Sequence, residues 1–168
     1  MTVFTTVASP VGEVLVAARD GAICAMAIGT APEPSWERDD HAAPLVAARE
    51  QLGAYFTGEL HDFDLPLELG GTPWQRRVWD AVAAIPYGRT RSYGDLAAEL
   101  CTPAAARAVG HANGRNPVCL AVPCHRVVGS DGRLTGFAGG LPMKEQLLTG
   151  EGVPVTRGRA DLTRRHQL

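Results

Sequence analysis

The hydrophobic pattern of this 168-residue chain changes at Thr72, and that change constrains the fold more than any other feature. Before Thr72, apolar residues alternate as they do in half-buried strands; after it, they recur at the spacing of short helices. The turn signal Asp20-Gly21 favours a hairpin within the first part. We therefore expect a small antiparallel sheet at the N-terminus. Its strands span residues 2–8, 13–18 and 22–28.

A stretch rich in proline and acidic residues, 29–44, follows this sheet and has no sustained period, so we expect an exposed loop. Helical spacing of apolar residues then returns, with Pro44 placed to open a helix and Gly58 to close it. One helix on a small sheet predicts an α+β domain over residues 1–68.

Residues typical of helix starts and ends recur in the second part of the chain. Residues 72–75 have the capping-box pattern with proline at the first helical position. A second helix starts at residues 92–95, and a third follows directly from Thr102 and ends near Gly114. Two short helices joined by a tight turn predict a helix-turn-helix.

Arg107 lies on one face of the third expected helix, between Ala104 and Ala108, whereas Val109 and Ala112 fall on the other face. A face of small side chains with one protruding guanidinium suits close approach to DNA. An alanine-rich surface helix formed by propensity alone gives the same pattern, so the helix by itself leaves both interpretations open.

The formal net charge of −2 conceals two unlike parts. Residues 1–72 carry 3 basic and 11 acidic side chains, a net charge of −8, whereas residues 73–168 carry 13 and 7, a net charge of +6. Clustered arginine neutralises phosphates, so the second part favours a nucleic-acid partner, with an uneven solvated surface as the alternative. No apolar run reaches the ~20 residues that span a bilayer, and no leader pattern opens the chain. We expect a cytoplasmic protein without membrane contact.

The four cysteines have no CxxC spacing, so reduced thiols are expected rather than a disulfide framework or a zinc site. Cys24, Cys101 and Cys119 are interpreted as small buried hydrophobes. The spacing from Cys119 to Cys124 and His125 also lacks a convincing fourth ligand, and we predict no metal.

Cys124 differs because of its neighbours. An apolar run ends at Pro123, which fixes the backbone directly before Cys124, His125 and Arg126. A free thiol has a pKa of about 8.5, and nearby cationic or hydrogen-bonding groups raise its reactive fraction. Adjacent side chains on an extended chain point apart, so His125 needs a turn or a bridging water to reach the sulfur. Glu151 is the candidate to orient the imidazole.

Two features follow this cysteine. Residues 127–134 predict a short hairpin that turns at Asp131-Gly132, where a wing would follow a helix-turn-helix. Phe137 lies among glycines within residues 136–140, which allows the backbone to approach a flat ligand while the ring supplies a stacking face.

The string from Pro123 to Val127, preceded by Asn116-Pro117 and followed by Gly139-Gly140, resembles the signature of the O6-alkylguanine-DNA alkyltransferases, or methylated-DNA–protein-cysteine methyltransferases. The resemblance runs from Trp74 to Gly152 and more loosely through the N-terminal part. It implies an RNase H-like N-terminal α+β domain. It also implies a C-terminal winged helix-turn-helix domain, residues 73–152, that carries the active site.

The resemblance implies a DNA repair protein that flips an O6-alkylated guanine into a pocket and transfers the alkyl group irreversibly to Cys124. His125 would remove the thiol proton through a water, and Glu151 would orient His125. Tyr93 would assist protonation of the leaving guanine. Arg107 would fill the vacated position in the base stack.

Other positions receive supporting roles from the same resemblance. Asn116 would brace the turn that leads to the active-site segment. The backbone carbonyls of Cys124 and Val127 would select guanine, and the amide of Ala138 would face O6. Phe137 replaces a tyrosine common in the family and Ala138 a frequent serine, and neither change should abolish activity. The residues expected to contact the flipped base or the DNA are Tyr93, Ala106, Arg107, Asn113, Arg126, Val127, Phe137 and Ala138.

Double-stranded DNA that contains O6-alkylguanine is therefore the expected partner, bound through its minor groove, with O4-alkylthymine left open as a substrate. We expect a monomer that needs no cofactor and is consumed after one turnover; cooperative binding along DNA is left open. The alternatives are an alkyltransferase-like protein that binds without repair, a winged-helix regulator and a Cys–His hydrolase. The first of these lacks the acceptor cysteine that is present here, and the last needs an oxyanion hole that the sequence does not reveal.

The basic tail, residues 153–168, has no assigned role. A terminal segment is ordered only when contacts tie it down. The sequence leaves both order and contact with phosphates open, and slightly favours disorder.

Overall fold

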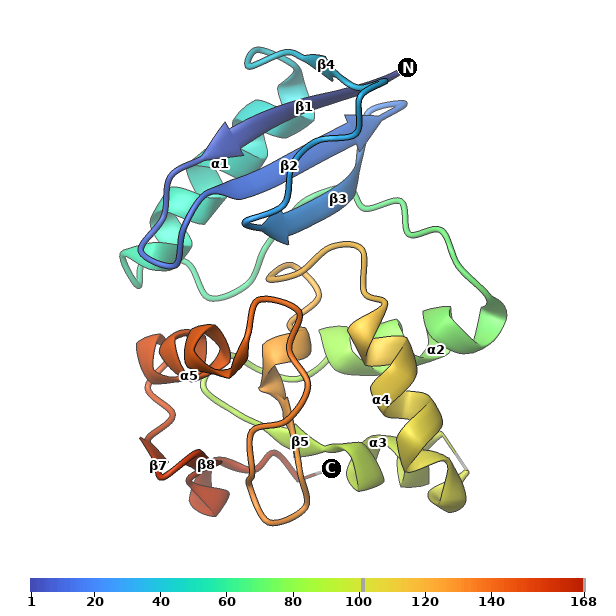
Figure 1. Cartoon of the computed structure of the whole chain (residues 1–168), viewed down its shortest axis with the longest axis vertical. Coiled ribbons are helices and arrows are strands. Elements are labelled where there is room, and N and C mark those ends of the chain that lie inside the picture. The colour runs from blue at the N-terminus through green and yellow to red at the C-terminus, as the bar shows by residue number, and fades with distance from the viewer. Residues whose placement is uncertain (101, 168) are drawn as a thin grey trace. The chain divides into compact units, whose positions relative to one another are not determined.

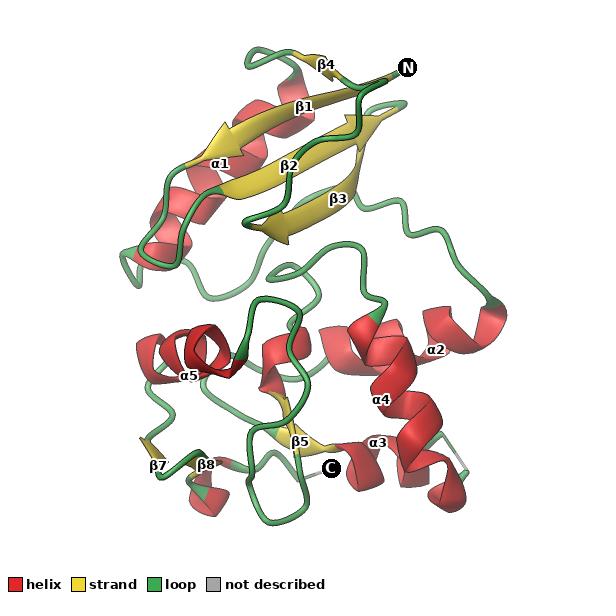
Figure 2. Cartoon of the chain, in the orientation of Figure 1, coloured by secondary structure: helices red, strands yellow, loops and turns green. Residues whose placement is uncertain are grey.

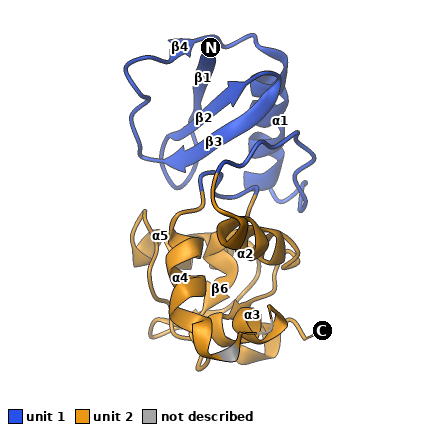
Figure 3. Cartoon of the chain, turned by 90° about the vertical axis from the view of Figure 1, so that its right-hand side faces the viewer, with its two compact units in different colours: residues 1–70, 117–121 blue, residues 71–116, 122–168 orange. Residues whose placement is uncertain are grey.

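The computed structural model describes residues 1–100 and 102–167, which form two compact units (Figure 3). Cys101, expected to be a small buried hydrophobe, lies outside the described residues. Within the described part of the chain, no helix has the length and apolar character needed to cross a bilayer. The first unit holds residues 1–70 and 117–121, and the second holds residues 71–116 and 122–168.

The first unit is a four-stranded sheet with one helix packed against it (Figures 1 and 2). The strand order is β3-β2-β1-β4, with β2 antiparallel to both β1 and β3, and β4 parallel to β1. The sheet and its helix confirm the sequence prediction, although β4 lies within the segment expected to be a loop. The elements are β1 (Thr2–Val7), β2 (Val14–Arg19), β3 (Ala22–Ile28), β4 (Glu37–Arg38) and α1 (Ala43–Phe56).

The hairpin between β2 and β3 depends on two residues with left-handed backbone. Asp20 has φ 52° and Gly21 has φ 80°, the combination required by a two-residue turn whose twist matches the strands. This turn places Val16 opposite Met26 in the centre of the sheet, and both side chains are fully buried with Leu52 of α1. The core of the first unit thus lies between the sheet and α1.

The free edge of β3 is covered by two other segments of the chain. Met26 donates a backbone hydrogen bond to Pro117 and accepts one from Cys119, each 2.9 Å long. Ile23 forms a parallel bridge with Leu67 in the same way. An edge strand has unpaired donors and acceptors, and these segments satisfy them.

Residues 117–121 consequently belong to the first unit, whereas the sequence assigned all of residues 73–152 to the C-terminal domain. The physical reason is the pairing with β3 together with burial of Val118 and Leu120, which are 0% and 2% exposed. The chain leaves the second unit before the reactive segment and re-enters it at Val122.

The second unit contains the expected helix-turn-helix, formed by α3 and α4 (Figure 1). The predicted capping box of Thr72 with Gln75 is present, and Ser92 with Asp95 forms a second one at the expected start of the next helix. The elements are α2 (Pro73–Ala83), β5 (Arg91–Ser92), α3 (Tyr93–Glu99), a 3₁₀ turn (Pro103–Ala105), α4 (Ala106–Gly114), a 3₁₀ turn (Cys124–Arg126), β6 (Val127–Val128), α5 (Leu141–Gly150), β7 (Val155–Thr156), β8 (Arg159–Ala160) and a last 3₁₀ turn (Leu162–Arg164).

The wing differs from the predicted hairpin. The chain turns at Asp131-Gly132 as expected, but β6 pairs in parallel with β5 and not with the returning strand. The returning residues bind the C-terminal tail instead: Leu134 N donates to Gly158 O and Ala160 N donates to Gly132 O, both at 2.8 Å. The turn itself is closed locally by the bond from Gly129 N to Arg133 O at 2.8 Å, and partners distant in sequence replace the rest of the predicted hairpin.

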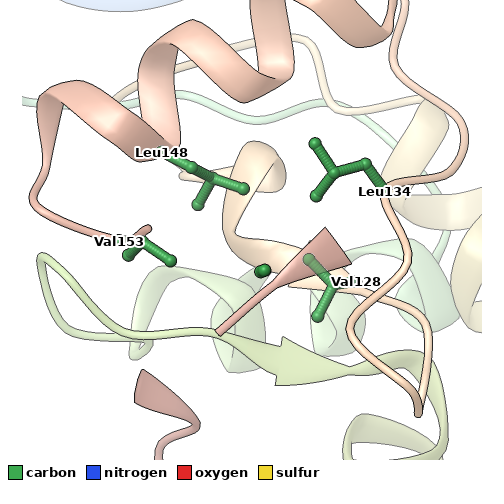
Figure 4. Close-up of a cluster of buried hydrophobic side chains, with 5 residues drawn as sticks. Val128, Leu134, Leu148 and Val153 are labelled. Atoms are coloured by element: carbon green, nitrogen blue, oxygen red, sulfur yellow. The ribbon is translucent and has the colours of Figure 1, made fainter. Parts of the chain in front are cut away.

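The tail is packed, in contrast to the disorder that the sequence slightly favoured. Its described part contributes two apolar side chains to a core that also includes residues of β6 and α5 (Figure 4). Burial of these side chains ties the segment down. The cluster consists of Val128, Leu134, Leu148, Val153 and Ala160, each at most 4% exposed.

Candidate active site

Cys124 opens a single 3₁₀ turn at the point where the chain re-enters the second unit. Its amide donates to Val122 O at 2.8 Å, the amide of Arg126 donates to Pro123 O at 2.9 Å, and the thiol-bearing residue is 5% exposed. The turn removes the extended geometry in which adjacent side chains point apart, which was the obstacle to cooperation between Cys124 and His125.

His125 is held by Glu151, as the sequence proposed. Its Nε2 lies 2.7 Å from Glu151 Oε2, and the imidazole is fully buried. Because Nε2 faces a carboxylate, we assign the proton to Nε2 and the lone pair to Nδ1, which has no hydrogen-bond partner within the described residues. Burial lowers the pKa of His125, and the attraction of Glu151 only partly opposes this effect. The imidazole is thus a neutral base at neutral pH.

Arg126 was expected at the DNA or the substrate, and its position corrects that expectation. Its side chain is in the interior: Nε donates to Glu151 Oε1 at 2.8 Å, Nη2 donates to Glu151 Oε2 at 2.9 Å and Nη1 donates to Ile85 O at 2.7 Å. Burial alone would raise the pKa of Glu151, but the hydrogen bonds from His125 and Arg126 and the charge of Arg126 hold it well below its usual range. Arg126 keeps the carboxylate ionised.

Tyr93 begins α3, and its hydroxyl donates to the carbonyl of Thr135 at 3.2 Å. The same carbonyl accepts a hydrogen bond of 2.8 Å from Lys144 Nζ, which also lies 6.0 Å from the centre of the Tyr93 ring. Burial raises the pKa of Tyr93, and the proximity of Cys124 raises it further. The phenol therefore retains its proton at neutral pH.

Lys144 was missed by sequence reasoning. It is 0% exposed, and burial lowers its pKa from 10.5 to about 8, while the nearby Cys124 acts in the opposite direction. Its position relative to Leu147, Leu148 and Glu151 gives spacings of three, four and seven residues, which place it on the buried face of α5. That spacing was the available signal.

A cavity of about 640 Å³ lies between the helix-turn-helix and the loop after the wing. Five of the predicted base- or DNA-contacting residues line it: Tyr93, Ala106, Arg107, Phe137 and Ala138. The other lining residues are Gly110, Gly114, Thr135 and Gly136, so most of the wall is formed by small side chains. The cavity can admit a flat aromatic group beside the Tyr93 hydroxyl.

Asn113, Asn116 and Val127 support the reactive turn from inside. Asn116 Nδ2 donates to Val122 O at 2.8 Å, where the sequence expected a brace. Asn113 was expected to contact the base or DNA, but it is only 4% exposed and its Nδ2 donates to Cys124 O at 3.3 Å. The amide of Val127 donates to the same carbonyl. Both lone pairs of Cys124 O are thus engaged, so a base can use this carbonyl only by displacing one donor.

The outer face of α4 has the predicted character. Arg107 and Ala108 are exposed, whereas Val109 and Ala112 are buried. A helix with this face presents one long cation above a smooth surface.

Comparison with known proteins gives consistent matches over both units. Residues 2–69 match the family model of the 6-O-methylguanine DNA methyltransferase ribonuclease-like domain, and residues 73–153 match that of its DNA-binding domain. The methylated-DNA–protein-cysteine methyltransferase of Mycolicibacterium paratuberculosis is 50% identical over 149 residues, which cover 86% of this chain and 89% of that relative.

Solved structures agree. The O6-methylguanine methyltransferase of Mycobacterium tuberculosis is 46% identical, with a TM-score of 0.83, and the match covers 97% of this chain and 98% of that one. The crystal structure of M. tuberculosis OGT in complex with DNA is 44% identical, with a TM-score of 0.83, and the match covers 89% and 92%.

Proposed function

The chain belongs to the 6-O-methylguanine DNA methyltransferase family and repairs DNA by direct alkyl transfer, and from this premise we propose that Cys124 receives the alkyl group. One observation carries the assignment. The buried thiol directly precedes a neutral imidazole whose Nε2 is fixed by Glu151 at 2.7 Å, which leaves Nδ1 as the available base.

Activation of the thiol follows from this arrangement. His125 takes the proton of Cys124 through a bridging water, and Glu151 stabilises the imidazolium that forms. Lys144, which is buried and within electrostatic range of Cys124, favours the thiolate over the thiol. The thiolate is therefore formed in a site in which two cations, Lys144 and Arg126, and the carboxylate of Glu151 have fixed positions.

Transfer forms one bond and breaks one. The thiolate attacks the alkyl carbon, the S–C bond forms, the C–O6 bond breaks, and its electron pair remains on the guanine. Tyr93 gives its proton to the departing base and regains one that came from the thiol, so the thiol proton ends on guanine. A thioether is a poor leaving group, which makes the protein a single-turnover reagent.

The substrate we propose is O6-alkylguanine in double-stranded DNA, approached from the minor groove by α4. Extrusion of a base costs a few kcal/mol, and Arg107 would occupy the vacated stack while Phe137 stacks on the flipped base. The small residues around Arg107 allow the helix axis to come close to the groove. We propose that the free protein is a monomer.

Intact mass spectrometry tests the assignment directly. After mixing with a duplex that contains O6-methylguanine, the protein should gain the mass of one methylene group, located on Cys124 by peptide mapping. Cys124→Ala should gain nothing while still binding the duplex. Loss of methyl groups from the DNA with no change in protein mass would contradict the mechanism. A duplex with O4-methylthymine in the same assay defines the substrate range.

A further inference from the structure

The end of the described chain pairs with Thr90, the residue directly before β5, through one isolated bridge. Thr90 N donates to Arg164 O at 3.1 Å and His166 N donates to Thr90 O at 2.7 Å, which makes a parallel bridge between Thr90 and Arg165. These bonds fix the backbone on both sides of Arg165. The tail that the sequence left without a role is therefore anchored directly before α3.

The side chain of Arg165 binds Asp95 with both arms of its guanidinium. Nε donates to Asp95 Oδ2 at 2.8 Å, and Nη2 pairs with Asp95 Oδ1. The two groups are only 34% and 20% exposed, which protects the ion pair from solvent screening. Although burial would raise the pKa of Asp95, the hydrogen bonds from Arg165 and Ser92 keep it below its usual range.

Asp95 is also the third residue of α3 and closes its capping box. Its carboxylate accepts a hydrogen bond of 2.9 Å from Ser92 N, and its amide donates to Ser92 Oγ at 3.0 Å. Arg165 thus holds the carboxylate that fixes the first turn of the helix.

Tyr93 is the first residue of that turn. Its ring packs beside Gly110, where an added Cβ would lie 3.5 Å from the ring, and its hydroxyl reaches Thr135 O at 3.2 Å. A small rotation of the turn would move the hydroxyl, which is at the far end of the side chain, by more than it moves the backbone.

We propose that Arg165 is a positioning residue for Tyr93, acting through the capping carboxylate of Asp95; this rests on the proposed role of Tyr93 as proton donor. The C-terminal segment then helps to position the proposed proton donor although Arg165 lies outside the cavity lining. If Arg165 instead only contacted DNA phosphates, its replacement would not change the rate of transfer from a substrate that lacks DNA.

The test compares Arg165→Ala with Arg164→Ala, which removes the same charge from an exposed neighbour. The substrate is free O6-benzylguanine, whose benzylic carbon is reactive enough to dispense with DNA. Arg165→Ala should slow transfer about tenfold, and Arg164→Ala should leave it unchanged. Labelling of Cys124 by iodoacetamide should be equal in both variants, because iodide leaves without a proton.

Two further measurements identify the route. In a Tyr93→Phe background, Arg165→Ala should cause no additional loss, since the group that it positions is absent. Arg165→Lys keeps the charge but loses the paired geometry, and it should show a smaller loss; this variant also covers the case in which the alanine variant fails to fold.

The outcomes separate the two proposals. If the unaltered protein gains no benzyl group on Cys124 from this base and no methyl group from duplex DNA, the proposed function fails. If the unaltered protein reacts but Arg165→Ala matches Arg164→Ala, the positioning role is wrong. Equal slowing of iodoacetamide labelling, or an undiminished effect in the Tyr93→Phe background, would also overturn it, because the residue would then act on the fold in general.

Discussion

Lys144 and Tyr93 donate hydrogen bonds to the same carbonyl, that of Thr135, and the ammonium lies 6.0 Å from the centre of the phenol ring. A buried cation thereby lies beside the proposed proton donor and within electrostatic range of the proposed nucleophile. The charge of Lys144 can influence both, because both are buried or half-buried beside it.

Replacement of this cation should weaken the nucleophile without weakening the fold. Lys144→Met retains the length of the side chain but removes its charge, so the thiolate of Cys124 should be less favoured and iodoacetamide labelling at neutral pH should fall roughly tenfold. Lys144→Arg, which keeps the charge, should retain more reactivity if it packs. Labelling rates measured across pH by intact mass provide the check.

Lys144 should also make the stability of the protein depend on pH in a predictable direction. In the folded protein the pKa of Lys144 is about 8, below its ordinary 10.5, so the unfolded chain binds more protons between these values. The protein therefore loses stability as the pH falls from about 10.5 towards 8. Lys144→Met should lack this pH dependence and be equally stable or about 1 kcal/mol more stable at pH 7. A clear loss of stability in urea unfolding would contradict this account.

The alkyl-transfer rate should stay constant as the pH is lowered through the ordinary pKa of histidine. Burial lowers the pKa of His125 below 6.5, so the base remains neutral at that pH, and the rate should fall only below it. For the same reason, His125 binds a proton at a higher pH in the unfolded chain than in the folded protein. Stability therefore declines as the pH drops below 6.5. Single-turnover rates and urea unfolding between pH 5 and about 8 test both statements. A rate that halves at pH 6.5 would show that His125 is not the base.

Arg107→Ala should slow repair of duplex DNA about 10- to 100-fold, since the cost of extruding the base is then not offset, and it should leave reaction with free O6-benzylguanine nearly unchanged. Arg115→Ala is the matched control, because this exposed arginine follows α4 and does not line the cavity. Equal losses in the duplex and free-base assays would refute insertion of Arg107 into the base stack.

Glu151 should have separable structural and catalytic effects. Glu151→Gln leaves the buried Arg126 without its counter-charge and should destabilise the fold by about 3 kcal/mol. Combination with Arg126→Met removes the stranded charge and should recover much of that loss, whereas alkyl transfer should remain slow in both variants. Urea unfolding and single-turnover rates, measured on the same samples, distinguish the two effects. Recovery of transfer together with stability would limit Glu151 to a structural role.

Local signals were sufficient for much of this structure. The turn at Asp20-Gly21, the capping box at Thr72 and the helical face around Arg107 are set by neighbouring residues, and all were predicted correctly. Cys124 was proposed from its immediate context, and the contact between His125 and Glu151 required only one long-range assumption.

The features that were not predicted from the sequence depend mostly on partners that are distant in the chain. Arg126 turns inward because its acceptors, Glu151 and Ile85, are 25 and 41 residues away, and nothing adjacent to Arg126 marks it as buried. The residues after the wing turn bind the tail at Gly158 for a similar reason. Lys144 is different, since its helical spacing was readable but lysine is seldom placed on a buried face.

The return of residues 117–121 to the first unit limits how this protein can be recombined with its relatives. The chain passes between the units three times, and the bonds between Met26 and its partners Pro117 and Cys119 join parts of the gene that a single junction would separate. A chimera that takes residues 1–70 from one homologue and the rest from another would therefore combine β3 of one protein with residues 117–121 of the other, which pair with its edge. Functional hybrids should need the short segment before Cys124 to be exchanged together with the N-terminal half.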